Sequence, residues 1–334
     1  MIDTNLRERD LNPHEIFKLV EGGLAEVERE LARHSHSNVQ LIERISRYIQ
    51  DSGGKRIRPA LLLLTSQMCG YQGPVVYRLG AVVELIHAAT LVHDDIIDDA
   101  KVRRGRPSVN AQWGNELTVL MGDWLYMTSF HLALGERHFK ILDILTEVTR
   151  KMIEGELIQL SLNGSMDVTE EQHLDISMRK TAFLFSACAQ IGGIVSSVSE
   201  QHEEYLRRYG LNIGIAFQMV DDVLDFTSTE STLGKPVVSD LKEGKLTLPL
   251  IYLMQEGEPQ HRELVRTVLR ENGFGSVNKE AIVDLVHKYK TVDRVMDKAH
   301  QYAREAKEYL LHFPESRARE ALTTIPDYIV ERDR

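Results

Sequence analysis

The sequence predicts an all-α protein in which residues 1–334 form a single domain. Apolar residues recur three and four positions apart along most of the chain, which is the spacing of one helix face. No stretch shows the convincing alternation of a half-buried strand, and no linker is long enough to mark a domain boundary. With 43% apolar residues, the chain has ample material for one large core.

Proline and glycine residues divide the chain into predicted helices. Pro13 stands at the first position of a helix that reaches about His34, and Gly53-Gly54 ends the next helix. Pro74 opens a long apolar helix that runs to Ile97. The predicted helices span residues 13–34, 38–50, 60–69, 74–97, 109–133, 139–162, 170–199, 203–225, 281–288, 292–312 and 316–330, and a further helix begins within 246–249.

Composition and charge exclude several classes of protein. The net charge of −10 and the lack of a basic block argue against a nucleic-acid partner. Cys69 and Cys188 are the only cysteines and form no CxxC motif, so we expect no disulfide framework and a cytoplasmic location. The polar segment from Met1 to Asp10 has no signal-peptide core.

One stretch is close to membrane-spanning length. Thr181–Ser199 carries no charged residue, but it contains serine, glutamine and glycine residues throughout. This composition favours a helix buried inside a large bundle over a membrane span. We therefore expect at most a peripheral contact with a membrane.

A cluster of carboxylates ends the apolar helix that begins at Pro74. Asp94 and Asp98 are four residues apart and share a helix face, and Asp95 flanks them. At about 4 Å, each pair of carboxylates repels by on the order of 1 kcal/mol in water, and the C-terminal end of a helix also disfavours anions. The cluster therefore suggests a missing cation, and all-oxygen ligands favour Mg²⁺. The alternative is a solvated acidic helix end followed by a basic turn.

The same spacing recurs 127 residues later, in Asp221, Asp222 and Asp225, again after an apolar helical run. Two helices could therefore face each other and present six carboxylates across one cavity. Such a cavity suits the handling of a diphosphate through bridging metal ions.

Basic residues supply candidate sites for anions. The segment Gly53–Pro59 places Lys55, Arg56 and Arg58 just before a helix, and its two glycines allow a close backbone approach to a ligand. Basic loops are common, so this signal gains weight only beside the acidic clusters. His87 lies seven residues before Asp94 and hence on nearly the same face, although a lone helical histidine is usually a core residue.

With these residues in view, the chain resembles the trans-isoprenyl (polyprenyl) diphosphate synthases over essentially its whole length, closest to the long-chain bacterial octaprenyl and heptaprenyl types. The resemblance is specific because five separated motifs follow the order of the family. They are Gly53–Pro59, Glu84–His87, Asp94–Asp98 with Arg103–Gly105, Gln218 with Asp221–Asp225, and Gly234–Lys245. The resemblance implies a large antiparallel helical bundle around a deep central cavity, working as a homodimer.

The resemblance also implies a role for each matched residue. The carboxylates expected to bind Mg²⁺, with three ions per active site, are Asp94, Asp95, Asp98, Asp221, Asp222 and Asp225. The residues expected to contact the allylic diphosphate are Arg103, Lys180, Lys235 and Lys245, with Thr181 and Gln218 near the reacting carbons. The residues expected to form the isopentenyl diphosphate pocket are Lys55, Arg58, His87 and Arg104. Asp99 matches no family position and is interpreted as a solvated neighbour.

The implied activity is a prenyl transfer. The allylic diphosphate ionises, the double bond of isopentenyl diphosphate attacks the allyl cation, and the departed diphosphate takes the proton, because no side-chain base stands out. Metal ions and cationic side chains lower this barrier by neutralising the leaving group. A dry apolar pocket protects the cation from water.

The product is expected to be long. Family members that make short products often place an aromatic residue four or five positions before the first acidic motif, where this chain has Thr90 and Ala89. A tunnel along residues 74–98 would be about 37 Å long, enough for about seven or eight isoprene units, as in the precursors of quinone side chains. A bulky residue on another helix could still form the floor, and Tyr126, Met127 and Phe130 are candidates.

The sequence opposes some alternative functions more strongly than others. A terpene cyclase has no need for Lys55, Arg58 and His87, and a regulatory subunit of a two-component synthase lacks the acidic motifs. The chain could be the catalytic subunit of such a heteromer. The nearest alternative is a short-chain (farnesyl or geranylgeranyl) synthase, which Ala89 and Thr90 oppose.

Overall fold

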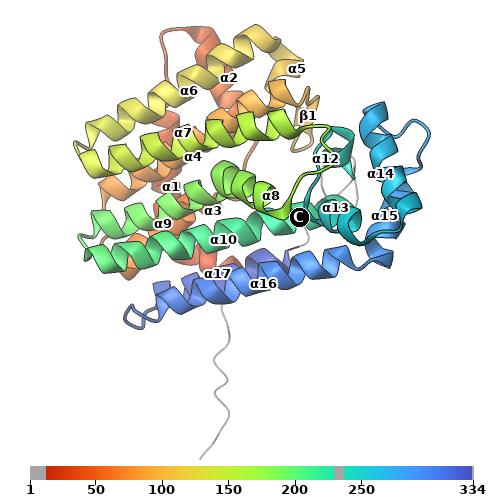
Figure 1. Ribbon diagram of the computed structural model, residues 1–334. Coiled ribbons are helices and arrows are strands. Elements are labelled where there is room, and N and C mark those ends of the chain that lie inside the picture. The colour runs from red at the N-terminus through yellow and green to blue at the C-terminus, as the bar shows by residue number, and fades with distance from the viewer. Residues whose placement is uncertain (1–12, 229–236, 333–334) are drawn as a thin grey trace, which may run out of the picture.

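The computed structural model describes residues 13–228 and 237–332 (Figure 1). The chain is almost entirely helical, as predicted. Its elements are α1 (Pro13–His34), α2 (Gln40–Asp51), α3 (Ile57–Met68), α4 (Pro74–Ile97), β1 (Val102–Arg103), β2 (Arg106–Pro107), α5 (Val109–Trp113), α6 (Asn115–Gly135), α7 (Phe139–Leu162), α8 (Glu170–Ser177), the π-helical turn η1 (Met178–Ala182), α9 (Phe183–Val195), α10 (Glu200–Thr227), α12 (Ser239–Lys242), α13 (Leu248–Glu256), α14 (Pro259–Glu271), α15 (Lys279–Lys288), α16 (Thr291–Leu310) and α17 (Arg317–Glu331).

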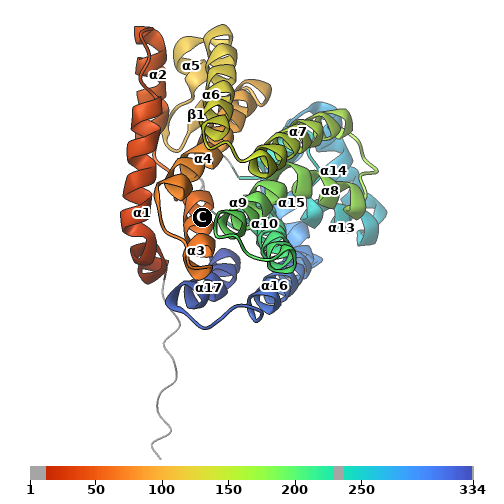
Figure 2. The same cartoon turned by 90° about the vertical axis from the view of Figure 1, so that its left-hand side faces the viewer.

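The long helices form a layered bundle around a shared hydrophobic core. α10 packs along both α9 and α16, and α4 packs along α6. Figure 2 shows α3, α9 and α10 in the middle, with α1, α2, α6, α7 and α16 towards the outside. Buried apolar residues from all of these helices belong to one connected cluster. α14 and α15 lie together at one end of the bundle (Figure 1).

The two most apolar helices are core helices. α9 carries most of the uncharged stretch that begins at Thr181, and nearly all of its residues are buried, which confirms the expectation of a helix inside a bundle. By length and composition, α4 could cross a membrane, yet 61% of its most apolar window is buried against other helices. Burial among helices accounts for the apolar character of both.

Three local features differ from the predicted elements. The helix predicted for residues 109–133 is broken at Gly114, which has a φ of 83° and separates α5 from α6. The helix predicted for residues 170–199 contains η1, one turn of π-helix. The chain also forms a tiny antiparallel hairpin, β1–β2, in which Arg103 is opposite Arg106. Two-residue strands leave too little alternation for a sequence pattern to reveal.

Small residues bring α10 close to η1. A side chain at Gly214 would lie 2.5 Å from the Cα atom of Ala182, so only glycine permits this approach. The close approach matters because η1 carries Lys180 and Thr181, and α10 carries the second acidic motif.

Candidate active site

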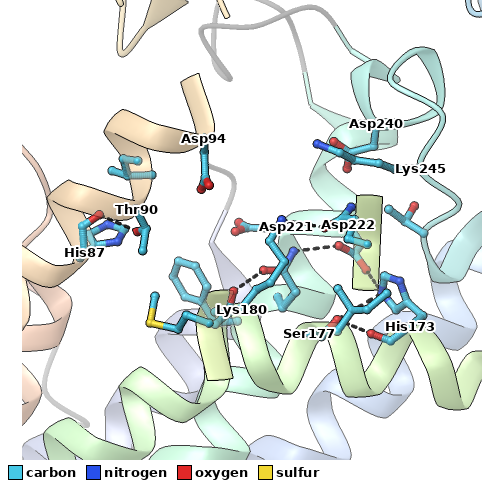
Figure 3. Close-up of a pocket in the computed structure, with 18 of the residues that line it drawn as sticks. His87, Thr90, Asp94, His173, Ser177, Lys180, Asp221, Asp222, Asp240 and Lys245 are labelled. Atoms are coloured by element: carbon cyan, nitrogen blue, oxygen red, sulfur yellow. Dashed lines mark hydrogen bonds and ion pairs between the residues drawn. The ribbon is translucent and has the colours of Figure 1, made fainter. Parts of the chain in front are cut away.

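A cavity of about 710 Å³ opens between α4, α7, η1 and α10. Figure 3 shows Asp94, Thr90 and His87 on α4 at one side, and Asp221, Asp222 and His173 across from them. The cavity wall thus combines both predicted acidic motifs with the predicted basic residues. The predicted site residues that line the cavity are Lys55, Arg58, His87, Thr90, Asp94, Arg103, Arg104, Lys180, Thr181, Gln218, Asp221, Asp222 and Lys245.

Asp94 is the residue of the first acidic motif that faces this cavity. Its position follows from helical spacing, because Thr90 lies one turn before it and His87 two turns before it. Burial raises the pKa of Asp94 to about 7, and the negative charges of Glu156 and Asp98 act in the same direction while Lys180 opposes them. An ionised Asp94 therefore lacks enough positive charge around it, as expected of a side chain whose usual partner is a cation.

Asp221 and Asp222 occupy the facing wall, and each already has partners. Asp221 forms an ion pair with Arg332, whose guanidinium is 3.7 Å above the Phe217 ring and donates a 2.8 Å hydrogen bond to the Phe217 carbonyl. Asp222 is buried and accepts hydrogen bonds from His173 Nε2 at 2.7 Å and Gln218 Nε2 at 3.0 Å. The two neighbouring carboxylates thus have different environments.

The donor set suits a hard cation that is completed by its ligand. Among residues 13–228 and 237–332, no group of three or more His, Cys, Asp or Glu side chains is assembled as a metal site. Mg²⁺ usually takes only one or two protein carboxylates and fills its shell with water and phosphate oxygens. Asp94 and Asp221 offer carboxylates from opposite walls, which is consistent with this mode.

Asp95, Asp98 and Asp225 are not among the residues that line the cavity, so the expectation of six carboxylates across it was wrong for these three. Asp95 is buried and is held by Arg103, whose Nε donates to its Oδ1 at 2.7 Å. Asp225 is fully buried and accepts hydrogen bonds from the backbone N–H and hydroxyl of Ser239 and from the Asp240 N–H. Helical spacing explains Asp95, because it is adjacent to Asp94. Asp225 is four residues after Asp221, and its hydrogen bonds to the Ser239 turn account for its direction.

Asp225 nevertheless helps to position Lys245, a residue of the cavity wall. By holding the first residues of α12, it fixes the turn that ends at Lys245, whose N–H donates to the Asp240 carbonyl at 2.8 Å. Lys245 Nζ lies 2.9 Å from Asp98 Oδ1. Burial alone would lower the pKa of Lys245, but Asp98 and Glu243 outweigh burial and raise it, so this side chain is a firmly charged cation. Lys235 lies outside the described residues.

The predicted isopentenyl diphosphate residues gather at one side of the cavity. Burial lowers the pKa of Arg58, whose Nε is buried without a hydrogen-bond partner among the described residues. Burial, with Arg58 and Arg104 close by, holds the pKa of His87 well below its ordinary value. Arg104 adopts a left-handed φ of 53° and donates to the Gly53 carbonyl. With Lys55 also in the wall, this side suits an anion.

Lys180 and Thr181 both face the cavity because η1 interrupts the α-helical register. A π-turn inserts one extra residue and is frequent at functional sites. Lys180 Nζ contacts Glu156 at 2.5 Å and Gln159 at 2.6 Å, and the Thr181 hydroxyl donates to Gln218 Oε1 at 2.8 Å. Sequence periodicity alone does not predict this turn.

The residues of the wall that the sequence interpretation missed include His173 and Arg332. His173 follows the N-terminal capping box of α8, a signal for a helix start and not for a site. Arg332 follows α17, and its side chain is only 5% exposed. A third basic residue, Arg56, contacts Glu28 and Glu84 at 2.6 Å each.

The residues that were expected to set product length lie at different depths. Thr90 lines the cavity, whereas Ala89 is fully buried and is not part of its described lining. Met127 is exposed on the surface, so it is not a floor residue. Tyr126 packs towards His93, with ring centroids 5.8 Å apart, and Phe130 packs against the core.

Comparison with known proteins identifies the family of this chain. Residues 39–286 match the polyprenyl synthetase family. The chain is 36% identical to the octaprenyl diphosphate synthase of Escherichia coli strain K12, over 97% of this chain and 100% of that protein, and 33% identical to the geranylgeranyl diphosphate synthase of Saccharolobus solfataricus, over 89% and 92%. It is also similar to a polyprenyl synthase from Caulobacter crescentus CB15 solved with calcium and isoprenyl diphosphate, with a TM-score of 0.92, 32% identity and coverage of 98% and 99%. The chain therefore belongs to the polyprenyl synthetase family, and it is a prenyltransferase of the trans-prenyl diphosphate synthase type.

Proposed function

We propose that this enzyme is a long-chain all-trans polyprenyl diphosphate synthase. It adds isopentenyl diphosphate repeatedly to an allylic primer such as farnesyl diphosphate and makes hepta- to octaprenyl diphosphate for quinone side chains. The observation that carries this proposal is the pairing of Asp94 and Asp221 across a cavity whose wall just below Asp94 is the small residue Thr90. Residues 1–334 form one polyprenyl synthase domain in this proposal.

The allylic diphosphate binds between the acidic motifs. Asp94, with Asp98 near it, and Asp221 hold the Mg²⁺ ions, for which we propose three per site. When bound, Mg²⁺ neutralises the diphosphate as it leaves. Lys180 and Lys245 are charged residues at the same opening and contact the diphosphate oxygens, as Lys235 does in this proposal. Arg103 orients Asp95 and reaches the cavity from the same turn.

Isopentenyl diphosphate binds on the other side, at Lys55, Arg58 and Arg104. His87 is neutral at pH 7 because its pKa is so low, so it contributes a hydrogen bond without adding charge. The Arg58 Nε–H is buried and has no hydrogen-bond partner in the described part of the chain, and an anion in this pocket offers it an acceptor. Two diphosphates thus approach from opposite sides, with their carbon chains between them.

The chemistry follows from this placement. Cationic side chains stabilise the leaving diphosphate, and Thr181 and Gln218 line the wall beside the carbon from which it leaves. Leu91, Met152 and Ile176 supply apolar wall that keeps water away from the allyl cation. The double bond of isopentenyl diphosphate attacks this cation, and the released diphosphate removes the proton.

Chain length separates the proposal from its nearest alternative, a short-chain synthase, since relatives of both kinds are similar to this chain. The small side chains of Ala89 and Thr90 support the longer product. A second alternative is that the chain is the catalytic subunit of a two-component synthase.

We further propose a homodimer, located in the cytoplasm and touching membranes at most peripherally. A stripe on α6 supports the dimer: Leu120, Met127 and Leu134 are spaced by seven residues and are 63%, 63% and 43% exposed. Such a stripe is typical of a helix that packs against a partner. Leu120→Glu with Met127→Glu should give monomers in light scattering, whereas Leu311→Glu, at an equally exposed leucine elsewhere, should not. A monomeric wild type would refute the dimer.

A product assay tests the function. The purified chain is incubated with farnesyl diphosphate, labelled isopentenyl diphosphate and Mg²⁺, and the hydrolysed products are resolved by reversed-phase chromatography. A ladder ending at seven or eight units is expected. Products that stop at three or four units would establish the short-chain alternative, and no product would point to a required partner subunit.

A further inference from the structure

Four buried or partly buried side chains form a continuous hydrogen-bonded chain along one wall of the cavity (Figure 3). The Thr181 hydroxyl contacts Gln218 Oε1 at 2.8 Å, Gln218 Nε2 contacts Asp222 Oδ1 at 3.0 Å, and Asp222 Oδ2 contacts His173 Nε2 at 2.7 Å. The chain crosses from η1 to α10 and then to α8. All four residues line the cavity.

The direction of each hydrogen bond follows from the chemistry of the carboxylate. An ionised Asp222 only accepts, so both His173 Nε2 and the Gln218 amide must donate to it. The Gln218 amide orientation is then fixed, and its carbonyl oxygen accepts from Thr181. His173 closes the chain at the end remote from Thr181. Its own helix holds it in place, since Ser177 donates to the His173 carbonyl at 2.9 Å and lies 3.4 Å from Nε2.

This arrangement separates the roles of the two adjacent carboxylates. Asp221 pairs with Arg332, whereas Asp222 has each oxygen occupied by a hydrogen-bond donor and is only 1% exposed. The Asp222 carboxylate is thereby linked to the Gln218 amide dipole and, through it, to the Thr181 hydroxyl dipole. Those dipoles keep their orientation only while Asp222 keeps its rotamer, and His173 holds the second oxygen.

We propose that His173 is a positioning residue for prenyl transfer. It acts through Asp222 to hold the Gln218 and Thr181 oxygens at the wall where positive charge develops on the allylic carbon. Oxygen dipoles that are fixed before the reaction stabilise such charge without reorganising, and a displacement of about 1 Å can cost about 100-fold in rate. The inference rests on the proposed function, because it assigns this wall to the allylic substrate.

The test compares three variants. His173→Leu removes the donor, and His173→Gln keeps an N–H at a similar reach. Gln172→Ala removes the hydrogen bond from the Thr169 N–H to Gln172 Oε1, one half of the capping box of α8, without touching the four-residue chain. For each variant, kcat, the KM for isopentenyl diphosphate, the Mg²⁺ half-saturation and the thermal midpoint of the metal-free protein are measured. The released prenyl alcohol is also counted, since it reports allyl cations that are captured by water.

His173→Leu should lower kcat by about 10- to 100-fold and raise the alcohol fraction, with little change in the KM for isopentenyl diphosphate or in Mg²⁺ half-saturation. His173→Gln should recover most of kcat, and Gln172→Ala should lower the thermal midpoint while kcat stays within about threefold. Normal kcat in His173→Leu would overturn the inference, as would an equal loss in Gln172→Ala. A rise confined to Mg²⁺ half-saturation would also overturn it and would make Asp222 a metal ligand. A wild type that makes no prenylated product refutes the proposed function, whereas an active wild type with an unaffected His173→Leu refutes only this inference.

Discussion

Replacing Asp94 with asparagine should stabilise the metal-free protein while abolishing turnover. Burial raises the pKa of the Asp94 carboxyl from 3.8 to about 7, so the folded protein keeps its proton to higher pH than the unfolded chain does. For a carboxyl group shifted in this direction, stability is complete below pH 3.8 and is lost as the pH rises towards 7. Asparagine has nearly the same shape and carries no charge to bury.

The magnitude follows from the pKa values. At about 1.4 kcal/mol per pKa unit, the ionised group destabilises the folded protein by at most about 4 kcal/mol at pH 8 and about 2 kcal/mol at pH 5.5. With an unfolding entropy of about 2.1 cal/mol/K per residue, these values correspond to melting-temperature increases of about 6 °C and about 3 °C in the variant. The gain should therefore grow with pH.

Thermal unfolding in a chelator, at both pH values, measures this difference. Asp99→Asn is the matched control, because Asp99 is exposed and its ion pair is with the exposed Lys101, so the midpoint of this variant should stay within about 1 °C of wild type. Mg²⁺ with an allylic diphosphate should then stabilise wild type more than Asp94→Asn. A variant no more stable than wild type, or a gain independent of pH, would refute the reasoning about burial, and near-normal turnover would refute the metal role.

Three further predictions test other parts of the site. Lys55→Ala should raise the KM for isopentenyl diphosphate about 10-fold or more and that for the allylic primer much less, as steady-state kinetics will show; the reverse pattern would exchange the two sites. Thr90→Tyr should shorten the product ladder more than Ala89→Tyr, because only Thr90 lines the cavity; unchanged ladders in both would place the tunnel elsewhere. Gly122→Ala should destabilise the protein by about 1–3 kcal/mol in urea unfolding, because the new Cβ would lie 2.1 Å from His93 Nε2. Unaltered stability would mean that the His93 ring turns aside freely.

Several features of the site could be predicted from local sequence. The spacing of His87, Thr90 and Asp94 places them on one helix face wherever that helix lies, because the period of the helix fixes their relative directions. The apolar segment that Pro74 opens likewise predicted a long helix, and α4 confirms it. The repetition of the acidic motif at Asp221 predicted a facing helix, and the shared cavity agrees with that prediction.

Other features depend on contacts between distant segments. Nothing in the local sequence distinguishes Asp222, which His173 and Gln218 hold, from Asp221, which pairs with Arg332 more than 100 residues later. The π-turn at Lys180 packs closely against α10, and Gly214 permits this approach.

The sequence by itself therefore determined the helical class, the family and the residue types of the site, because helix periodicity and motif spacing act over a few residues. Only the tertiary structure decided which carboxylates reach the cavity. Asp95 and Asp225 follow the same motif pattern as Asp94 and Asp221, yet their hydrogen bonds to Arg103 and to the Ser239 turn hold them outside. The physical reason is that burial and hydrogen-bond partners come from the packing of several helices, and no single segment of the chain contains them.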